Sequence, residues 1–233
     1  MTDEALWSKA ASLLSPGEVK TTFDVGAHTG YITDKFLEFF PSTTVYSFEP
    51  DPETFRRLAA RFQGEVRVCP VNAAVSSLDG SASFFQNSDP HASSLFPRNT
   101  TGRRYYRDDL IMKSETTVPC VTLDRFAGER GIAHIDLLKM DAQGGEYDVL
   151  KGAGGLLATQ AIDVVVSEFF FIPHYENAPL LDSIWSLLRS FGYDIYTLQV
   201  GKVGSNGQAR WGDAIFLSRR HREKVLDVFP EEP

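Results

Sequence analysis

The chain has 233 residues, 42% of them hydrophobic, which is enough to bury the core of one large α/β domain. Its formal net charge of −8 argues against general binding of nucleic acid, because such proteins carry a basic surface. The N-terminal residues lack an apolar signal segment, and the apolar run 162–166 is far shorter than the roughly 20 residues that cross a bilayer. We therefore expect a cytoplasmic protein of one domain, residues 1–233, without a membrane span.

Apolar runs alternate with amphipathic stretches along the chain. In order, the predicted elements are strand 21–25, helix 31–40, strand 43–49, helix 52–62, strand 66–71, short strands 73–75 and 81–85, an extended segment 117–123, helix 124–130, strand 135–140, helix 146–152, strand 162–167, helix 180–190, and strands 193–198 and 214–217. Strands that alternate with helices indicate a parallel sheet, and the last two strands, with no helix between them, should pair antiparallel. The sequence thus predicts a Rossmann-like α/β fold with helices on both faces of a mostly parallel seven-stranded sheet and a terminal antiparallel hairpin, as is typical of class I methyltransferases.

The first two predicted strands carry a pattern that suits a nucleoside. Asp24, Gly26 and Gly30 surround the turn after the first strand, and Glu49 ends the second strand after about one βαβ crossover. A carboxylate in that place can accept hydrogen bonds from both ribose hydroxyls. His28 stands where a dinucleotide fingerprint has the glycine that admits a pyrophosphate, so a cofactor without phosphate is favoured.

S-adenosylmethionine is the phosphate-free adenosine cofactor that this pattern favours. Its cationic groups attract acids, so we expect Asp24 to face the ammonium group, directly or through water. Gly26 and Ala27 would bring backbone close to the methionine portion, while Asn72 and Ala73 would flank the adenine. The predicted cofactor site comprises Asp24, Gly26, Ala27, His28, Gly30, Glu49, Pro50, Asn72, Ala73 and Asp141.

These motifs resemble those of the FkbM-type family of S-adenosylmethionine-dependent methyltransferases. The resemblance rests on residues 23–31, 46–51, 71–75, 121–124, 138–146 and 149–153, and the run around Lys139, Asp141 and Glu146 is its most specific part. It implies O-methylation of a hydroxyl on a sugar or another secondary metabolite. Many relatives carry Glu where this chain has Gln143, which calls a catalytic carboxylate at that position into doubt.

The candidate catalytic residues are Asp141, Glu168 and His174. Asp141 and Glu168 end two strands that should be neighbours, so their carboxylates would lie about 5–10 Å apart. They could hold a divalent metal ion or the acceptor hydroxyl, or cap the following helix. His174, on the loop after Glu168, and His28 are further candidate bases. Lys139 shares a strand face with Asp141 and is expected to form a structural ion pair.

The segment of residues 86–115 is longer than an ordinary loop between strands, so we predict that it forms a lid or a substrate insert. The expected acceptor contacts are His91, Ser93, Arg103 and Arg104 from the insert, together with Tyr175. The arginines favour an anionic small molecule or saccharide as acceptor. A solvated loop or an oligomer contact are the alternatives.

Two other functions are compatible with the sequence. An NAD-dependent oxidoreductase would use the same fold, although His28 in place of glycine opposes it. A catalytically silent nucleoside-binding partner would keep the fold without turnover. Binding of S-adenosylhomocysteine compared with NAD(H) separates these possibilities.

Overall fold

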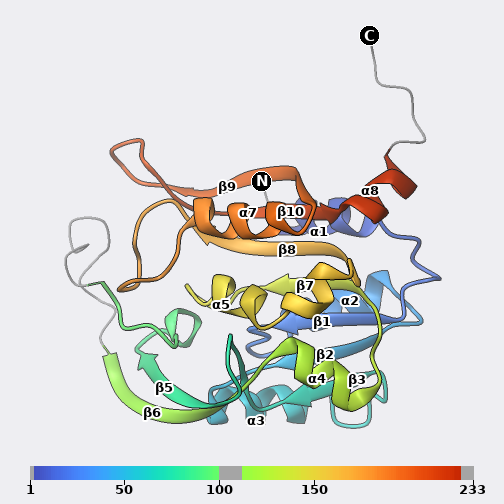
Figure 1. The fold of residues 1–233 in the computed structure, drawn as a ribbon. Coiled ribbons are helices and arrows are strands. Elements are labelled where there is room, and N and C mark those ends of the chain that lie inside the picture. The colour runs from blue at the N-terminus through green and yellow to red at the C-terminus, as the bar shows by residue number, and fades with distance from the viewer. Residues whose placement is uncertain (1–2, 100–111, 227–233) are drawn as a thin grey trace.

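The computed structural model describes residues 3–99 and 112–226, and its centre is a seven-stranded sheet (Figure 1). The strand order is β3-β2-β1-β7-β8-β10-β9. The first five strands pair in parallel, and β10 pairs antiparallel with both β8 and β9, so the predicted sheet and hairpin are confirmed. The strands are β1 (Thr21–Val25), β2 (Thr44–Phe48), β3 (Val68–Val71), β7 (Ile135–Met140), β8 (Ile162–Phe170), β9 (Tyr193–Val203) and β10 (Ala209–Ser218).

Helices cover both faces of this sheet (Figure 1). One face buries Phe23, Leu138 and Val165 against four helices, α4 (Leu123–Arg130), α5 (Glu146–Lys151), α6 (Gly154–Ala158) and α7 (Leu181–Ser190). The other face buries Val45 and Val164 against α1 (Asp3–Ser12), α2 (Tyr31–Phe39), α3 (Pro52–Arg61) and α8 (Arg219–Val225). Within the described residues, no helix combines the length and the apolar character that crossing a membrane requires.

A smaller three-stranded sheet lies beside the large one, in the order β4-β6-β5. Its strands are β4 (Ala74–Val75), β5 (Gly80–Asn87) and β6 (Met112–Val121). Antiparallel pairing of β5 with β6 brings the two ends of the predicted insert together. The insert therefore begins and ends as strand, and its described middle portion contains the short 3-10 helix η1 (Pro90–Ala92).

Three features differ from the sequence prediction. Strand β8 continues beyond Glu168 to Phe170, because β10 pairs with it as far as Trp211. Strands β9 and β10 are also longer than expected. Helix α1 was not predicted; its residues Leu6 and Trp7 are buried against the sheet.

Candidate functional site

The large sheet reverses its chain order between β1 and β7, and a hollow lies at the carboxyl ends of these strands. Its volume is about 670 Å³, including space open to solvent. Its lining includes the acids Glu49 and Asp141 and the apolar residues Ala73, Phe84 and Leu95. The remaining lining residues are Val25, Gly26, His28, Phe48, Pro50, Ala74, Val75, Pro90, His91, Ser93, Ala142, Gln143 and Gly145.

Gly26 forms the turn after β1 and touches the neighbouring strand end. Its φ of 73° lies in the left-handed region, and a Cβ there would stand 1.9 Å from the carbonyl oxygen of Asp141. The N–H groups of Gly26 and Ala27 donate to the Phe48 carbonyl at 3.1 and 2.9 Å. Only glycine fits at position 26, and it leaves backbone exposed on the hollow.

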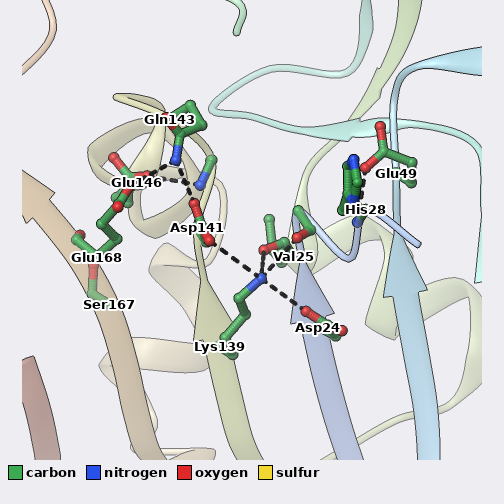
Figure 2. Close-up of polar contacts among 12 residues, drawn as sticks. Asp24, Val25, His28, Glu49, Lys139, Asp141, Gln143, Glu146, Ser167 and Glu168 are labelled. Carbon is green, nitrogen blue, oxygen red and sulfur yellow. Dashed lines mark hydrogen bonds and ion pairs between the residues drawn. The ribbon is translucent and has the colours of Figure 1, made fainter. Parts of the chain in front are cut away.

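Asp24 does not reach the hollow. Its carboxylate is completely buried, with Oδ1 3.0 Å from Lys139 Nζ and Oδ2 accepting a 2.8 Å hydrogen bond from Thr33. Lys139 also donates to the carbonyls of Val25 (3.1 Å) and Gly26 (2.8 Å), as Figure 2 shows. The buried Asp24 carboxylate therefore cannot contact a cofactor ammonium directly, whereas the predicted ion pair of Lys139 is confirmed.

Burial opposes the charge on Lys139, but the carboxylates of Asp24 and Asp141 outweigh this effect and raise its pKa. The ammonium group therefore stays charged beneath the turn at Gly26. It fixes the carbonyls that end β1 and thereby shapes the floor of the site.

Glu49 presents a buried carboxylate at the end of β2 (Figure 2). Its Oε2 accepts from the His28 N–H at 2.9 Å and its Oε1 from the Asp51 N–H at 2.8 Å. Burial raises the pKa of Glu49 to about 7, although both backbone donors oppose the shift. Each carboxylate oxygen has two lone pairs, so a bound hydroxyl could still donate to either one.

Three further residues of the predicted cofactor site do not line this hollow. Asn72 donates to the Glu49 and Pro50 carbonyls at 2.8 and 3.2 Å and so holds the turn after β2. Gly30, with φ 88°, begins α2 at a point where a Cβ would collide with Phe62. Ala27 lines a neighbouring hollow instead.

Asp141 and Glu168 are brought together by the side chain of Gln143 (Figure 2). The Gln143 amide nitrogen donates to Asp141 Oδ1 at 2.7 Å and to Glu168 Oε2 at 2.8 Å. Burial first, and then the charge of Asp141, raise the pKa of Glu168 well above its ordinary value. The two acids thus share one amide donor at the edge of the hollow.

The predicted metal site at Asp141 and Glu168 is not supported, because an N–H donor rather than an electron-pair donor completes this pair. Among the described residues, the group close enough to share an ion is His134, Asp136 and Asp163. That group lies at the amino ends of β7 and β8, away from the hollow, and His134 Nε2 is 3.1 Å from Asp163 Oδ2.

Glu146 is buried and caps the N–H groups of the loop between β7 and α5. Its carboxylate accepts from the N–H groups of Ala142 at 2.7 Å and Gly144 at 3.0 Å. Burial raises its pKa to about 7. This cap fixes the loop on which Gln143 stands.

His174 is buried rather than exposed on a surface loop. Its ring lies 4.4 Å from that of Phe170 and 5.4 Å from that of Trp211, centroid to centroid. Burial, followed by the charges of Arg98 and Arg210, lowers the pKa of His174 to about 3. The imidazole is therefore neutral at physiological pH.

Residues of the insert close the hollow. His91 of η1 stacks on His28 with ring centroids 3.8 Å apart, and Ser93 lines the wall. Burial and His91 lower the pKa of His28 to about 4. Arg103 and Arg104 lie outside the described residues, so their predicted contact with the acceptor stays a prediction.

Tyr175 is completely buried, and its hydroxyl donates to Gln143 Oε1 at 2.7 Å. The sequence placed it in contact with the acceptor, but its nearest polar partner is the amide that joins the acid pair. Sequence reasoning missed this use of Gln143 and Tyr175, which are 32 positions apart. It also missed Trp211 and Asp213, which line the adjoining hollow together with Asp141 and Glu168.

A sheet of this strand order, with a hollow at the reversal point and a buried acid after β2, defines the Rossmann-like methyltransferase class. The chain belongs to the methyltransferase FkbM domain family, whose sequence model matches residues 24–195. It is accordingly an S-adenosylmethionine-dependent methyltransferase.

Two curated relatives match most of the chain. The 2-O-methyltransferase NoeI of Sinorhizobium fredii is 29% identical over 177 residues, which cover 72% of this chain and 70% of that protein. The 31-O-demethyl-FK506 methyltransferase FkbM of Streptomyces tacrolimicus is 33% identical over 211 residues, covering 80% of this chain and 76% of that protein.

Solved structures show the same fold at low sequence identity. Magnesium protoporphyrin IX methyltransferase from Synechocystis superposes with a TM-score of 0.51 at 9% identity, over 92% of this chain and 77% of that one. A putative RNA methyltransferase from Pyrococcus horikoshii superposes with a TM-score of 0.50 at 14% identity, over 92% of this chain and 83% of that chain.

Proposed function

We propose that this protein transfers a methyl group from S-adenosylmethionine to a hydroxyl oxygen of a small-molecule acceptor. Both curated relatives carry an O-methyl transfer in their names, which supports oxygen as the nucleophile. The observation that carries the proposal is a pair of adjoining hollows that share Asp141: one is lined by the buried Glu49 and the other by Glu168. S-adenosylmethionine, when bound, supplies an electrophilic methyl group, and the protein supplies position and a proton acceptor.

The lining of the hollow fits this cofactor. Glu49 would accept from the ribose hydroxyls with its remaining lone pairs, and Ala73, Phe84 and Leu95 offer an apolar slot for adenine. The backbone at Gly26 would meet the methionine portion, because no side chain intervenes there. The turn at Gly26, which Lys139 holds in place, would contact the methionine portion of the cofactor in place of Asp24.

Glu168 is the best-placed general base. An alcohol attacks poorly until its proton is removed, and a carboxylate whose pKa is raised is a stronger base for that task. Burial and Asp141 raise the pKa of Glu168, whereas His174 and His28 have depressed pKa values and bind a proton poorly at neutral pH. The acceptor hydroxyl would therefore pass its proton to Glu168 as its oxygen takes the methyl group.

The acceptor is proposed to be an uncharged, hydroxyl-rich molecule such as a sugar or another secondary metabolite. The adjoining hollow, about 1230 Å³ including open solvent, is lined by the acids Asp141, Glu168 and Asp213 and by the aromatic rings of Tyr31 and Trp211. Carboxylates accept from hydroxyls and repel anions, while the rings provide apolar contact. An anionic acceptor would depend on Arg103 and Arg104.

Calorimetry and a transfer assay test the proposal. S-adenosylhomocysteine should bind with one-to-one stoichiometry and much more tightly than NADH, and Glu49→Gln should weaken it at least about tenfold through loss of charge-assisted hydrogen bonds. Methyl transfer is then measured with isotope-labelled S-adenosylmethionine and a panel of neutral and phosphorylated sugars and macrolide alcohols. Tight NADH binding would instead indicate an oxidoreductase, and cofactor binding without transfer to any acceptor a silent partner.

A further inference from the structure

The amide group of Gln143 is held at both ends. Its nitrogen donates to Asp141 Oδ1 and Glu168 Oε2, and its oxygen accepts from the Tyr175 hydroxyl at 2.7 Å. Two N–H groups therefore meet two carboxylates, and the carbonyl oxygen meets the Tyr175 hydroxyl. A flipped amide would turn its oxygen toward two carboxylates, which accept hydrogen bonds when ionised, so the acid pair favours the orientation observed.

The backbone of Gln143 is restrained as strongly as its side chain. Gln143 has φ 52°, a left-handed conformation that non-glycine residues seldom adopt. The hydroxyl of Ser94 donates to its carbonyl at 2.7 Å, and the Tyr175 hydroxyl also lies 3.1 Å from the Ala92 carbonyl. The insert and the loop after β8 thus both contact Gln143 in the loop after β7.

We infer that Gln143 and Tyr175 are positioning residues that keep two N–H donors on the acid pair and thereby keep Glu168 able to accept a proton. Tyr175 acts through Gln143, and Gln143 acts through the carboxylates. The inference rests on the proposed function, because the role of Glu168 as base belongs to that proposal.

The charges around Glu168 explain why such donors matter. Asp141 after β7, Glu146 of α5 and Asp213 of β10 all oppose its ionisation, in addition to burial. Lys139 of β7 is a cation that interacts with it, and Lys139 is already paired with Asp24. The two amide donors act against these effects, because a hydrogen bond to a carboxylate favours its ionised form.

The titration of Glu168 tests the inference without any acceptor. The protein is labelled with glutamate carrying ¹³C in its side-chain carboxyl group, and the Glu168 resonance is assigned with Glu168→Gln. In Tyr175→Phe we expect the titration midpoint to rise by at least about one pH unit, a tenfold change in the acid constant. Gln143→Met, which removes both donors at a half-buried position, should shift the midpoint at least as far.

Tyr193→Phe is the matched control. Tyr193 is also completely buried, and its hydroxyl donates at 2.8 Å to the carbonyl of Ile162, at the far end of β8. This variant loses a comparable hydrogen bond and should leave the Glu168 titration unchanged. An unshifted midpoint in both Tyr175→Phe and Gln143→Met would overturn the inference; if Tyr175→Phe does not fold, Gln143→Met alone decides.

Failure of the inference can be distinguished from failure of the proposed function. Calorimetry with S-adenosylhomocysteine reports on the proposed function and should give the same affinity in Tyr175→Phe and the wild type. Cofactor binding and methyl transfer with an unshifted Glu168 would overturn only the positioning role. Absence of S-adenosylhomocysteine binding in the wild type would overturn the proposed function, whatever the titration shows.

Discussion

Asp24 and Lys139 form a buried ion pair across neighbouring parallel strands, with 3.0 Å between Oδ1 and Nζ. The two residues are register partners in the pairing of β1 with β7, so the sheet itself places their side chains on one face. The pair lies directly below the turn at Gly26, whose carbonyl accepts from the same ammonium group. The stability of the fold and the shape of the cofactor loop are therefore coupled.

Lys139→Met should strongly destabilise the protein, because it leaves the Asp24 carboxylate buried without its cation. We expect the free energy of unfolding to fall by about 3–5 kcal/mol, measured by urea denaturation. Adding Asp24→Asn should recover part of that loss. Glu38→Gln, which removes the exposed pair with Lys35, is the control and should cost less than about 1 kcal/mol. Equal losses in the two single variants would contradict the structural role.

Gly26→Ala should impair both stability and cofactor binding, since its Cβ would overlap the Asp141 carbonyl. Gly64→Ala provides the comparison: Gly64 has a similar φ of 90°, but a Cβ there would meet nothing within 4 Å. The Gly64 variant should lose about 1–2 kcal/mol from backbone conformation alone. The Gly26 variant should lose more and should bind S-adenosylhomocysteine weakly or not at all, by thermal denaturation and calorimetry. Similar behaviour of the two variants would argue against a close approach at Gly26.

The affinity for S-adenosylhomocysteine should depend on pH around neutrality. The pKa of Glu49 is raised to about 7 in the free protein, and ribose hydroxyls donate to the ionised form. Affinity should therefore be greatest above pH 7 and decline by up to about tenfold per pH unit below it. Calorimetry between pH 5.5 and 8.5, roughly the range that brackets this transition, gives the profile. In Glu49→Gln the dependence should disappear; its persistence would assign it to another group.

Glu168→Gln and His174→Gln should separate the two candidate bases. Removing the general base should lower kcat by about 10²–10⁴-fold, with S-adenosylhomocysteine binding preserved. His174 binds a proton poorly because its pKa is lowered to about 3, so His174→Gln should change kcat by less than tenfold, roughly the effect of altered packing. The reverse ranking of the two variants would move the role of base to His174.

The fold could be predicted well because its signals are local. Strands 21–25 and 135–140 are apolar runs bounded by turn residues, and the structure confirms their limits. The extension of β8 to Phe170 depends on pairing with β10, about forty residues later, which no local pattern encodes. Helix α1 escaped prediction because its sequence has only a weak apolar stripe.

The site could be predicted only as far as strand ends determine it. Glu49, Asp141 and Glu168 lie where parallel strands finish, and the sequence shows this directly. The partners of a side chain are a different matter, because they come from other elements. The sequence predicted Asp24 as a cofactor contact, but its carboxylate forms an ion pair with Lys139. The hydrogen bond from Tyr175 to Gln143 joins two loops that are distant in sequence.

The wall residues His91 and Ser93 follow β5 of the small sheet, whereas Glu49 follows β2 of the large sheet. Amino-acid substitutions in that wall can therefore accumulate without disturbing the strand pairing that positions Glu49 in the cofactor site. Substitutions in this short segment could therefore change the specificity for the acceptor alcohol during evolution. Exchanging the segment between family members could alter acceptor specificity by design.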